Sequence, residues 1–382
     1  MNKVQSVLLD LIKQSQFGIK EPICFADIDI DELYCEAKQQ TVLSLIAAEI
    51  PDELSNTKWF QAKLRQKAAY IKYCSFQNDL KVILDSEGIP FVILKGNSSA
   101  IYYSDPTLRS MGDVDFLVPQ DMYEKTKSVL ASYGYKEDHD NGRHAAFKKD
   151  NQLFEVHHHF SHGIDIEDYL ISGLNEREFV EIEGYEFPIL PTMANGLVLL
   201  DHFRRHLLYS VGLRQVIDWM MYVYRNLDDE FWNNEFGPVA KEKGIDKLAI
   251  TLTRMCQIYL GLPDTINWCK SDDDSTCLLL LKSIFDSGNF GNKKGVGKKF
   301  ERINLRIKNI GVFRWLQELG EKNWQAYHKC HLLKPFCWLY QLIRFIKKGL
   351  ISRRGINSIY KDFSSSNERY ILLKQLNLSD YL

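Results

Sequence analysis

The sequence predicts an α/β (α+β) fold in which a small group of short strands lies between long helical segments. Three apolar runs, at 91–94, 114–118 and 152–157, are bounded by glycine, proline or other turn residues and have the length of buried strands. The stretches on either side repeat apolar residues at helical spacing instead. With 382 residues, of which 45% are hydrophobic, the chain is long enough for two or three packed units.

The first 80 residues are predicted to be helical, with breaks at Pro22 and Pro51. Residues 59–86 have the periodicity of one long helix that leads directly into the first strand. Four residues at helical spacing are predicted to form one apolar face of this helix: Leu64, Ala68, Ile71 and Cys74.

The turn after the first strand has residues that favour an anion site. The strand stops at Lys95-Gly96, and Gly96 opens a helix whose first residues include Asn97 and Ser98. Backbone N–H groups in the first turn of a helix have no partner within the helix, and they attract anions. We therefore expect Gly96, Asn97 and Ser98 to lie against a phosphate group.

Two carboxylates, Asp113 and Asp115, lie two residues apart at the start of the second predicted strand. Because strand side chains alternate, both point to one side while Val114 and Phe116 enter the core. Two like charges on one face repel each other unless a cation lies between them, and Mg²⁺ takes oxygen ligands. On an exposed edge strand the same pair would merely be solvated, so the interpretation depends on the neighbouring motifs.

A third acid follows on a later strand. Residues 143–149 and 152–157 are predicted to form a hairpin that returns the chain to the carboxylate edge. Its second strand places Glu155 and His157 on one face. We expect this face to be the one that carries the two aspartates.

Three consecutive histidines, His157 to His159, raise the alternative of a zinc site. Consecutive residues on a strand cannot all face one ion. We therefore expect only His157 at the site, where it contacts the substrate or supports a ligand. His144, on the partner strand of the hairpin, is either a second histidine of the site or a structural residue.

Three segments follow one another in the order of a known family: Leu-Lys-Gly at 94–96, Gly-Asp-Val-Asp-Phe-Leu-Val at 112–118 and Phe-Glu-Val-His-His-His-Phe at 154–160. Together they resemble the uncharacterised bacterial nucleotidyltransferases of the DNA polymerase beta-type nucleotidyltransferase superfamily, over residues 80–225. This chain has Gly96-Asn97 where the superfamily usually has Gly-Gly or Gly-Ser. The departure concerns the phosphate contacts and not the metal site.

The resemblance implies a small mixed β-sheet core at 81–190 and an N-terminal helical segment at 1–80. A helical region at 191–290 would pack on the core, and a basic helical region would follow at 291–382. The implied activity is Mg²⁺-dependent transfer of a nucleoside monophosphate from a nucleoside triphosphate to an acceptor hydroxyl on a small molecule, a sugar or a protein. A tRNA- or RNA-directed transferase and a catalytically inert nucleotide-binding module are the alternatives.

In such a site Asp113, Asp115 and Glu155 would be the catalytic residues and would hold two Mg²⁺ ions. Lys95 and Arg109 are the nearest cations, and they either bind the phosphates or neutralise the carboxylates. We assign His157 to the nucleotide as well.

The resemblance also places three polar residues of the following two helices beside the nucleotide: His202, Arg214 and Asp218. An equal alternative is that Arg214 and Asp218, four residues apart, form a buried ion pair within one helix. We do not expect these residues to be catalytic.

Charge is unevenly distributed along the chain. Residues 293–354 hold 16 Lys or Arg and three Glu, a local charge of +13, whereas the whole chain carries −2 and the remainder therefore −15. This basic region is predicted to contact RNA or an anionic membrane surface, and a membrane would require an outward aromatic face of Phe336, Trp338 and Phe345. A core helix with a solvated stripe is the third alternative for 336–351.

The cysteines and the N-terminus indicate the cellular compartment. Eight scattered cysteines contain no CxxC pair, which predicts reduced thiols. The N-terminal residues have the spacing of an amphipathic helix and not of a secretory leader. We therefore expect a cytoplasmic protein that reaches a membrane, if at all, from its surface.

Overall fold

The computed structural model describes residues 1–382 except 20, 162, 271–272, 289–297, 350–366 and 382. The chain divides into two compact units, Met1–Lys293 and Lys294–Leu382, and each is described by itself. None of the described helices is long and apolar enough to cross a membrane.

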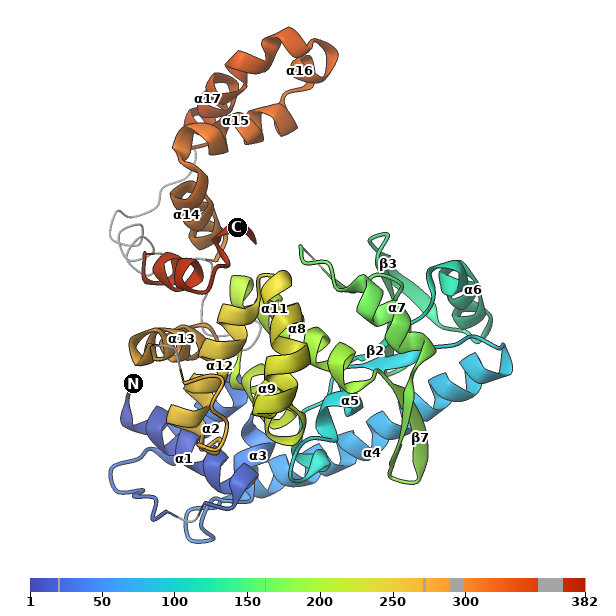
Figure 1. Cartoon of the computed structure of the whole chain (residues 1–382), viewed down its shortest axis with the longest axis vertical. Helices are drawn as coiled ribbons and strands as arrows, with labels where there is room; N and C mark the ends of the chain where they lie inside the picture. Colours follow the sequence, from blue (N-terminus) through green and yellow to red (C-terminus); the bar gives the residue numbers. More distant parts are fainter. Residues whose placement is uncertain (20, 162, 271–272, 289–297, 350–366, 382) are drawn as a thin grey trace. The chain divides into compact units, whose positions relative to one another are not determined.

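The first unit begins with four helices: α1 Lys3–Phe17, α2 Ile30–Gln39, α3 Leu43–Ala47 and α4 Thr57–Ser86. The predicted long helix is therefore confirmed as α4, which runs along one side of the sheet (Figure 1). Its predicted apolar face is wrong for three of its four residues, because Leu64, Ala68 and Ile71 are exposed. Only Cys74 of that face is buried, together with Tyr70 and Tyr73. The helix carries two apolar stripes, and the one with the larger aromatic side chains buries more area against the sheet.

The sheet of the first unit has seven strands in the order β3-β4-β5-β2-β1-β7-β6. β2 pairs in parallel with β5, and β1 in parallel with β7, while the other neighbouring strands are antiparallel. The predicted mixed sheet is therefore confirmed. The strands are β1 Val92–Leu94, β2 Val114–Leu117, β3 Lys136–Asp140, β4 His144–Lys149, β5 Gln152–His157, β6 Glu178–Ile182 and β7 Tyr185–Ile189.

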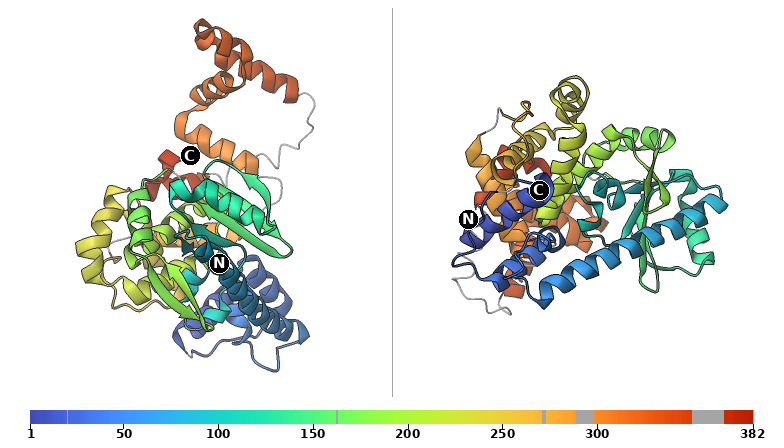
Figure 2. Two further views of the ribbon diagram at one scale, coloured as in Figure 1. Left: turned by 90° about the vertical axis from the view of Figure 1, so that its right-hand side faces the viewer. Right: turned by 90° about the horizontal axis from the view of Figure 1, so that it is seen from below.

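The two faces of the sheet differ in chemistry. One face packs Val114, Phe116, Phe154 and Val156 against α4 and against α6, Tyr123–Ser132. Strand alternation turns Asp115, Glu155 and His157 to the opposite face. Helices α7 Glu167–Asn175, α8 Thr192–Tyr209 and α9 Leu213–Asn226 lie on that side, as the views in Figures 1 and 2 show. The polar face of the sheet thus lies under helices and not in open solvent.

The remaining helices of the first unit follow α9 in a smaller bundle. They are α10 Asp229–Phe231, α11 Gly237–Glu242, α12 Asp246–Leu260 and α13 Asp274–Ser287, with a π-helical turn at Trp232–Phe236. Within this part Trp232 and Trp268 stack with nearly parallel rings, 3.9 Å between centroids.

The second unit is helical: α14 Lys298–Ile310, α15 Val312–Asn323, α16 Gln325–Lys329 and α17 Cys337–Gly349. Trp315 stacks on Phe345, and Trp324 on Tyr340, so these rings hold α15 and α17 together. Phe336, Trp338 and Phe345 are the aromatic residues that a membrane-facing helix would have to turn outward. Phe345 and Trp338 instead make ring contacts within the unit, because Trp338 meets the ring of Phe313 at 5.5 Å. Phe336 alone of the three is exposed, at 55%. Residues 293–297 and 350–354 of the predicted basic region lie outside the described residues.

Candidate active site

The parallel pairing of β2 and β5 brings the predicted carboxylates together. Asp115 and Glu155 are direct partners in the register of these two strands, so their side chains lie side by side on one face. Ligand atoms of Asp115, Glu155 and His157 all lie within 4.8 Å of one another. Asp113 precedes β2 and lines the same cavity as Asp115.

The carboxylates open into a cavity of about 240 Å³ between the sheet and helices α8 and α9. Its lining residues are Lys95, Gly96, Arg109, Gly112, Asp113, Asp115, Glu155, His202, His206 and Arg214. This volume is below the about 300–1,000 Å³ that is typical of pockets for drug-sized ligands.

The helix that follows Gly96 is short, α5 Asn97–Ala100, and its first side chains are buried away from the cavity. Asn97 donates from Nδ2 to Oε1 of Gln77 at 2.6 Å, and the Ser98 hydroxyl donates to the carbonyl of Lys95 at 2.7 Å. The backbone N–H of Ser98 donates to the carbonyl of Lys95 at 2.8 Å. A phosphate contact from this turn would therefore come from the backbone of Gly96 or Asn97, and this part of the sequence interpretation remains a prediction.

Asp115 is the centre of a charged network. Lys95 Nζ and His157 Nε2 lie 2.8 Å and 3.0 Å from Oδ1 of Asp115. Burial opposes ionisation of this carboxyl, but Lys95 and His157 outweigh it and lower its pKa below the usual range. Lys95 has a φ of +53°, a backbone conformation that residues other than glycine rarely adopt and that is often found at functional sites.

The neighbouring acids have the opposite shift. Burial, with Asp115 and Asp113 nearby, raises the pKa of Glu155 to about 8. The charge of Asp115, together with burial, also raises the pKa of Asp113. The cluster thus holds more carboxylates than its own cations neutralise. Its oxygen donors and its missing positive charge both fit Mg²⁺.

Arg109 is committed to another acid. Its Nε and Nη2 bind the two carboxylate oxygens of Asp218 at 2.7 and 2.8 Å, and the Tyr103 hydroxyl also donates to Asp218 at 2.6 Å. All three residues are buried. Of the two roles predicted for Arg109, the structure shows that of a charge partner, but for Asp218 and not for the metal-site carboxylates. The pair of Arg214 with Asp218, which was one of the two alternatives for these residues, does not form, because Arg109 already fills the fork of this carboxylate.

The three consecutive histidines diverge, as expected. His157 joins Asp115, while His158 hydrogen-bonds to the carbonyl of Gly142 at 2.9 Å and His159 lies 3.5 Å from Glu167. The ring of His144 lies 5.0 Å from that of His157 but does not line the cavity. His144 is thus a neighbour of the site and not a part of its wall.

Four residues near the site were not predicted from the sequence. His206 lies one helical turn after His202 on α8, with the rings 4.4 Å apart, and that spacing was a readable signal. Phe160, at the end of the third motif, has Arg205 at 4.3 Å and Lys95 at 5.6 Å from its ring centre. The remaining residue is Tyr73 on α4, whose hydroxyl donates to the carbonyl of Asp113 at 3.0 Å. No local sequence pattern predicts that Arg205 and Tyr73 lie near the site, because their positions depend on packing between elements that are distant in the sequence.

We expect Gly96→Ala to lower the free energy of unfolding by about 2–3 kcal/mol. Gly96 has a φ of +50°, and a Cβ there would collide with the hydroxyl of Tyr73. The collision would also move Tyr73 away from the carbonyl of Asp113, so nucleotide affinity should fall as well. Chemical denaturation and calorimetric titration with ATP and Mg²⁺ measure the two effects.

Gly112→Ala is the matched control, because Gly112 lines the same cavity and a Cβ there meets no atom within 4 Å. Its stability should equal that of the wild type. Removing the Tyr73 hydroxyl with Tyr73→Phe should make Gly96→Ala less costly in the double variant. A Gly96→Ala protein as stable as the Gly112→Ala protein would contradict this account of the turn.

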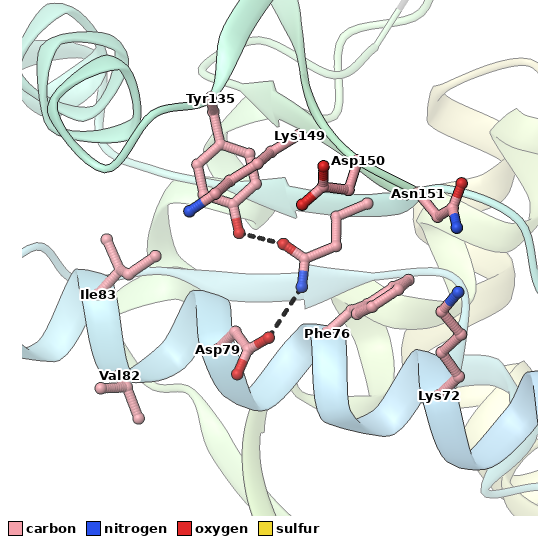
Figure 3. Close-up of a pocket in the computed structure, with 10 residues that line it drawn as sticks. Lys72, Phe76, Asp79, Val82, Ile83, Tyr135, Lys149, Asp150 and Asn151 are labelled. Carbon is pink, nitrogen blue, oxygen red and sulfur yellow. Dashed lines mark hydrogen bonds between the residues drawn. The ribbon is translucent and has the colours of Figure 1, made fainter.

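A second and larger cavity, of about 510 Å³, lies between α4 and the turn that joins β4 to β5 (Figure 3). At its centre Gln152 donates to Oδ2 of Asp79 at 2.8 Å and accepts a hydrogen bond from the hydroxyl of Tyr135. These polar groups satisfy one another, and the cavity lies away from the carboxylates. Size alone therefore does not identify the functional site of this protein.

Adjacent strands that carry a DxD pair and a third acid at a small cavity that cations also line are what a nucleotidyl-transfer site requires. The family model described as "Uncharacterised nucleotidyltransferase" matches residues 26–261, more than half of the chain. The chain belongs to this family, which confirms the family resemblance predicted from the three motifs. No curated protein matches the chain.

Six chains of known structure match the fold. One is the antibiotic-resistance factor ANT(2'')-Ia, which is 12% identical over 45% of this chain and 93% of its own, with a TM-score of 0.34. Another is an antigenic nucleotidyltransferase-like protein from Paracoccidioides brasiliensis, 14% identical over 49% of this chain and 91% of its own, with a TM-score of 0.32.

Proposed function

We propose that the protein transfers a nucleoside monophosphate from a nucleoside triphosphate to the hydroxyl of an acceptor, with Mg²⁺ as cofactor. The observation that carries the proposal is the register of β2 and β5, which places Asp115 beside Glu155 at a cavity also lined by Asp113. An inert nucleotide-binding module would not need three carboxylates at one place, where the charge of Asp115 with burial raises the pKa of Asp113, and burial with the charge of Asp115 raises that of Glu155.

In the proposed reaction the acceptor oxygen forms a bond to the α-phosphorus, and the bond between this phosphorus and the α,β-bridging oxygen breaks. Pyrophosphate leaves with the electron pair, and the hydroxyl proton passes to solvent. Asp113, Asp115 and Glu155 would hold Mg²⁺, which supplies charge stabilisation at the phosphates and lowers the pKa of the attacking hydroxyl.

The residues of the chain contribute positioning and charge. Lys95 neutralises Asp115 in the free protein, so it becomes available to a phosphate oxygen when Asp115 serves as a ligand. His157 fixes the orientation of Asp115 through its hydrogen bond. The acceptor is a small molecule, a sugar or a protein, and an RNA acceptor is the alternative.

Nucleoside triphosphates labelled at the α-phosphate test the proposal. The protein is incubated with each of the four, with Mg²⁺ and with fractions of a cell extract, and label bound to any acceptor is measured. Label should be transferred to an acceptor only when Mg²⁺ is present, and a chelator should stop this transfer. Sensitivity of the labelled product to ribonuclease or to protease then identifies the acceptor class. If calorimetry shows no nucleotide binding and no fraction takes up label, the proposed activity is wrong.

We further propose that the second unit binds an anionic membrane surface. Phe313, Leu332 and Phe336 are 61%, 86% and 55% exposed, and the exposed cations Arg314 and Lys334 lie next to them in the sequence. Apolar side chains flanked by cations suit a bilayer with anionic lipids, whereas RNA mainly requires the cations.

Binding to vesicles that contain phosphatidylglycerol should weaken steeply as salt rises, because screening removes the electrostatic attraction. A variant with Phe313, Leu332 and Phe336 all changed to Ser should bind these vesicles at least about tenfold more weakly, since each buried apolar side chain contributes about 1.5–3 kcal/mol. Phe179→Ser, which removes an exposed ring on β6, is the control and should bind as the wild type does. Unchanged vesicle binding by the triple variant, or binding to tRNA alone, would reject the membrane proposal.

A further inference from the structure

The candidate active-site cavity is lined by a partly buried cation, Arg214, that forms no ion pair with a described residue. Arg214, at the start of α9, lines the cavity and donates from Nη1 to the carbonyl of Ser110 at 3.3 Å. Its buried Nε has no hydrogen-bond partner. In the described part of the chain, no carboxylate lies within ion-pair distance of this guanidinium. Asp218, four residues further along the same helix, forms its ion pair with Arg109 instead. A buried and unpaired charge is costly, so a protein keeps one where an anion binds.

Two histidines stand beside this arginine. His202 and His206 lie one turn apart on α8 and line the same cavity, with ring centroids 4.4 Å apart. Burial lowers the pKa of both rings, that of His206 to about 4, and the nearby cations add to the effect. Both are therefore neutral at pH 7 in the free protein. A neutral imidazole can still donate one N–H to an anion, and an anion favours its protonated form.

We infer that Arg214, His202 and His206 form a binding wall for the β- and γ-phosphates of the nucleotide. The inference rests on the proposed function for the identity of the ligand. The wall and the metal-site carboxylates line the same cavity, so a polyphosphate bound there would meet both. A cavity of about 240 Å³ accommodates a polyphosphate chain but is below the about 300 Å³ at which sites for larger ligands begin. The nucleoside would therefore extend from its mouth.

This assignment changes the expected source of the phosphate contacts. The sequence placed them at the backbone N–H groups of the turn at Gly96, Asn97 and Ser98, where the N–H of Ser98 already donates to the carbonyl of Lys95 at 2.8 Å. In nucleotidyl transfer, negative charge develops on the departing pyrophosphate. A fixed guanidinium on that side stabilises the leaving group without reorganisation during the reaction. Arg214 is thus assigned to the leaving group, while Lys95 lies next to Asp115.

Inorganic pyrophosphate tests the wall without the nucleoside and without an acceptor. Calorimetric titration of the full chain in Mg²⁺ should show binding to the wild type that is about 10- to 100-fold weaker in Arg214→Met. Arg214→Lys keeps the charge but loses the planar fork, and should lie between the two. Arg225→Met removes an exposed guanidinium from the other end of α9 and should bind as the wild type does.

Thermal unfolding without ligand separates binding from a structural role. Because Arg214 is partly buried, forms no ion pair and has a buried Nε without a hydrogen-bond partner, Arg214→Met should melt at or above the wild-type Tm, while the rise in Tm that pyrophosphate gives should disappear. Arg214→Gln, which can retain the bond to Ser110, is the second variant for the same measurement. Wild-type pyrophosphate affinity in these variants, or a Tm several degrees lower with unchanged affinity, would overturn the assignment.

The outcome is distinguishable from a failure of the proposed function. Pyrophosphate binding that depends on Arg214, in a protein that moves no label from any nucleotide, would keep the anion site and reject the transferase. Label transfer at the wild-type rate by Arg214→Met would reject the wall and leave the transferase standing.

Discussion

Asp115→Asn should reduce label transfer from the nucleoside triphosphate by about 1,000-fold. Asp115 is the buried carboxylate that contacts both Lys95 and His157 and lies in register with Glu155. The amide keeps the shape of the side chain but loses the charge that a metal ligand needs. Asp113→Asn should lose activity in the same way, because Asp113 lines the same cavity. The initial rate of labelling, at saturating nucleotide and Mg²⁺, measures the effect.

The control for this experiment is Asp121→Asn, which neutralises an exposed aspartate shortly after the same strand. It should transfer label at the wild-type rate. Circular dichroism of Asp115→Asn shows whether the fold is retained, and calorimetry shows whether nucleotide affinity falls as well. Retention of more than a tenth of the wild-type rate by Asp115→Asn would remove Asp115 from the proposed metal site.

The largest expected effect on stability comes from the buried pair of Arg109 and Asp218. Asp218→Ala should lower the free energy of unfolding by about 3–5 kcal/mol, because it leaves a buried guanidinium without its counterion. Both side chains are only 4% exposed, and Tyr103 also loses its acceptor. Chemical denaturation of the wild type and the variant measures the difference.

A double variant, Arg109→Met with Asp218→Leu, should recover most of this loss, since a buried ion pair can be replaced by packed apolar side chains at little cost. The control is Asp168→Ala, which removes an exposed acid of α7 and should change the free energy of unfolding by less than about 0.5 kcal/mol. If Asp218→Ala lowers the free energy of unfolding by less than about 1 kcal/mol, water reaches Arg109 and the ion pair contributes little to stability.

Local patterns were enough to locate the elements that build the site. The alternation of Val114 and Phe116 with Asp113 and Asp115 predicted which side of β2 enters the core, and both apolar residues are buried. The turn at 150–151 predicted the hairpin of β4 and β5 and so the return of Glu155 to the aspartates. Period-two spacing is a property of the strand itself, so it is readable without knowledge of the neighbours.

The sequence did not show which of two chemically similar residues would form a given contact. The i, i+4 spacing of Arg214 and Asp218 indicated a local pair as one alternative, but Arg109, more than a hundred residues away in the sequence, takes this carboxylate. In α4 the stripe of Leu64 and Ile71 competed with that of Tyr70 and Tyr73, and contact with the sheet decided the outcome. Both outcomes have one cause, because long-range packing determines which of two suitable side chains is desolvated.

The pairing of β1 with β7 has a consequence for how the protein is made. β1 lies in the middle of the sheet, but one of its two neighbours, β7, joins it in parallel through Ile93 and Ile189. During synthesis one edge of β1 therefore remains without a hydrogen-bonded neighbour until β7 has left the ribosome. Non-local pairing of this kind is slow and leaves an apolar edge exposed meanwhile. We therefore expect the nascent chain to pass through an aggregation-prone stage that ends only when β6 and β7, the last two of the seven strands, have been made.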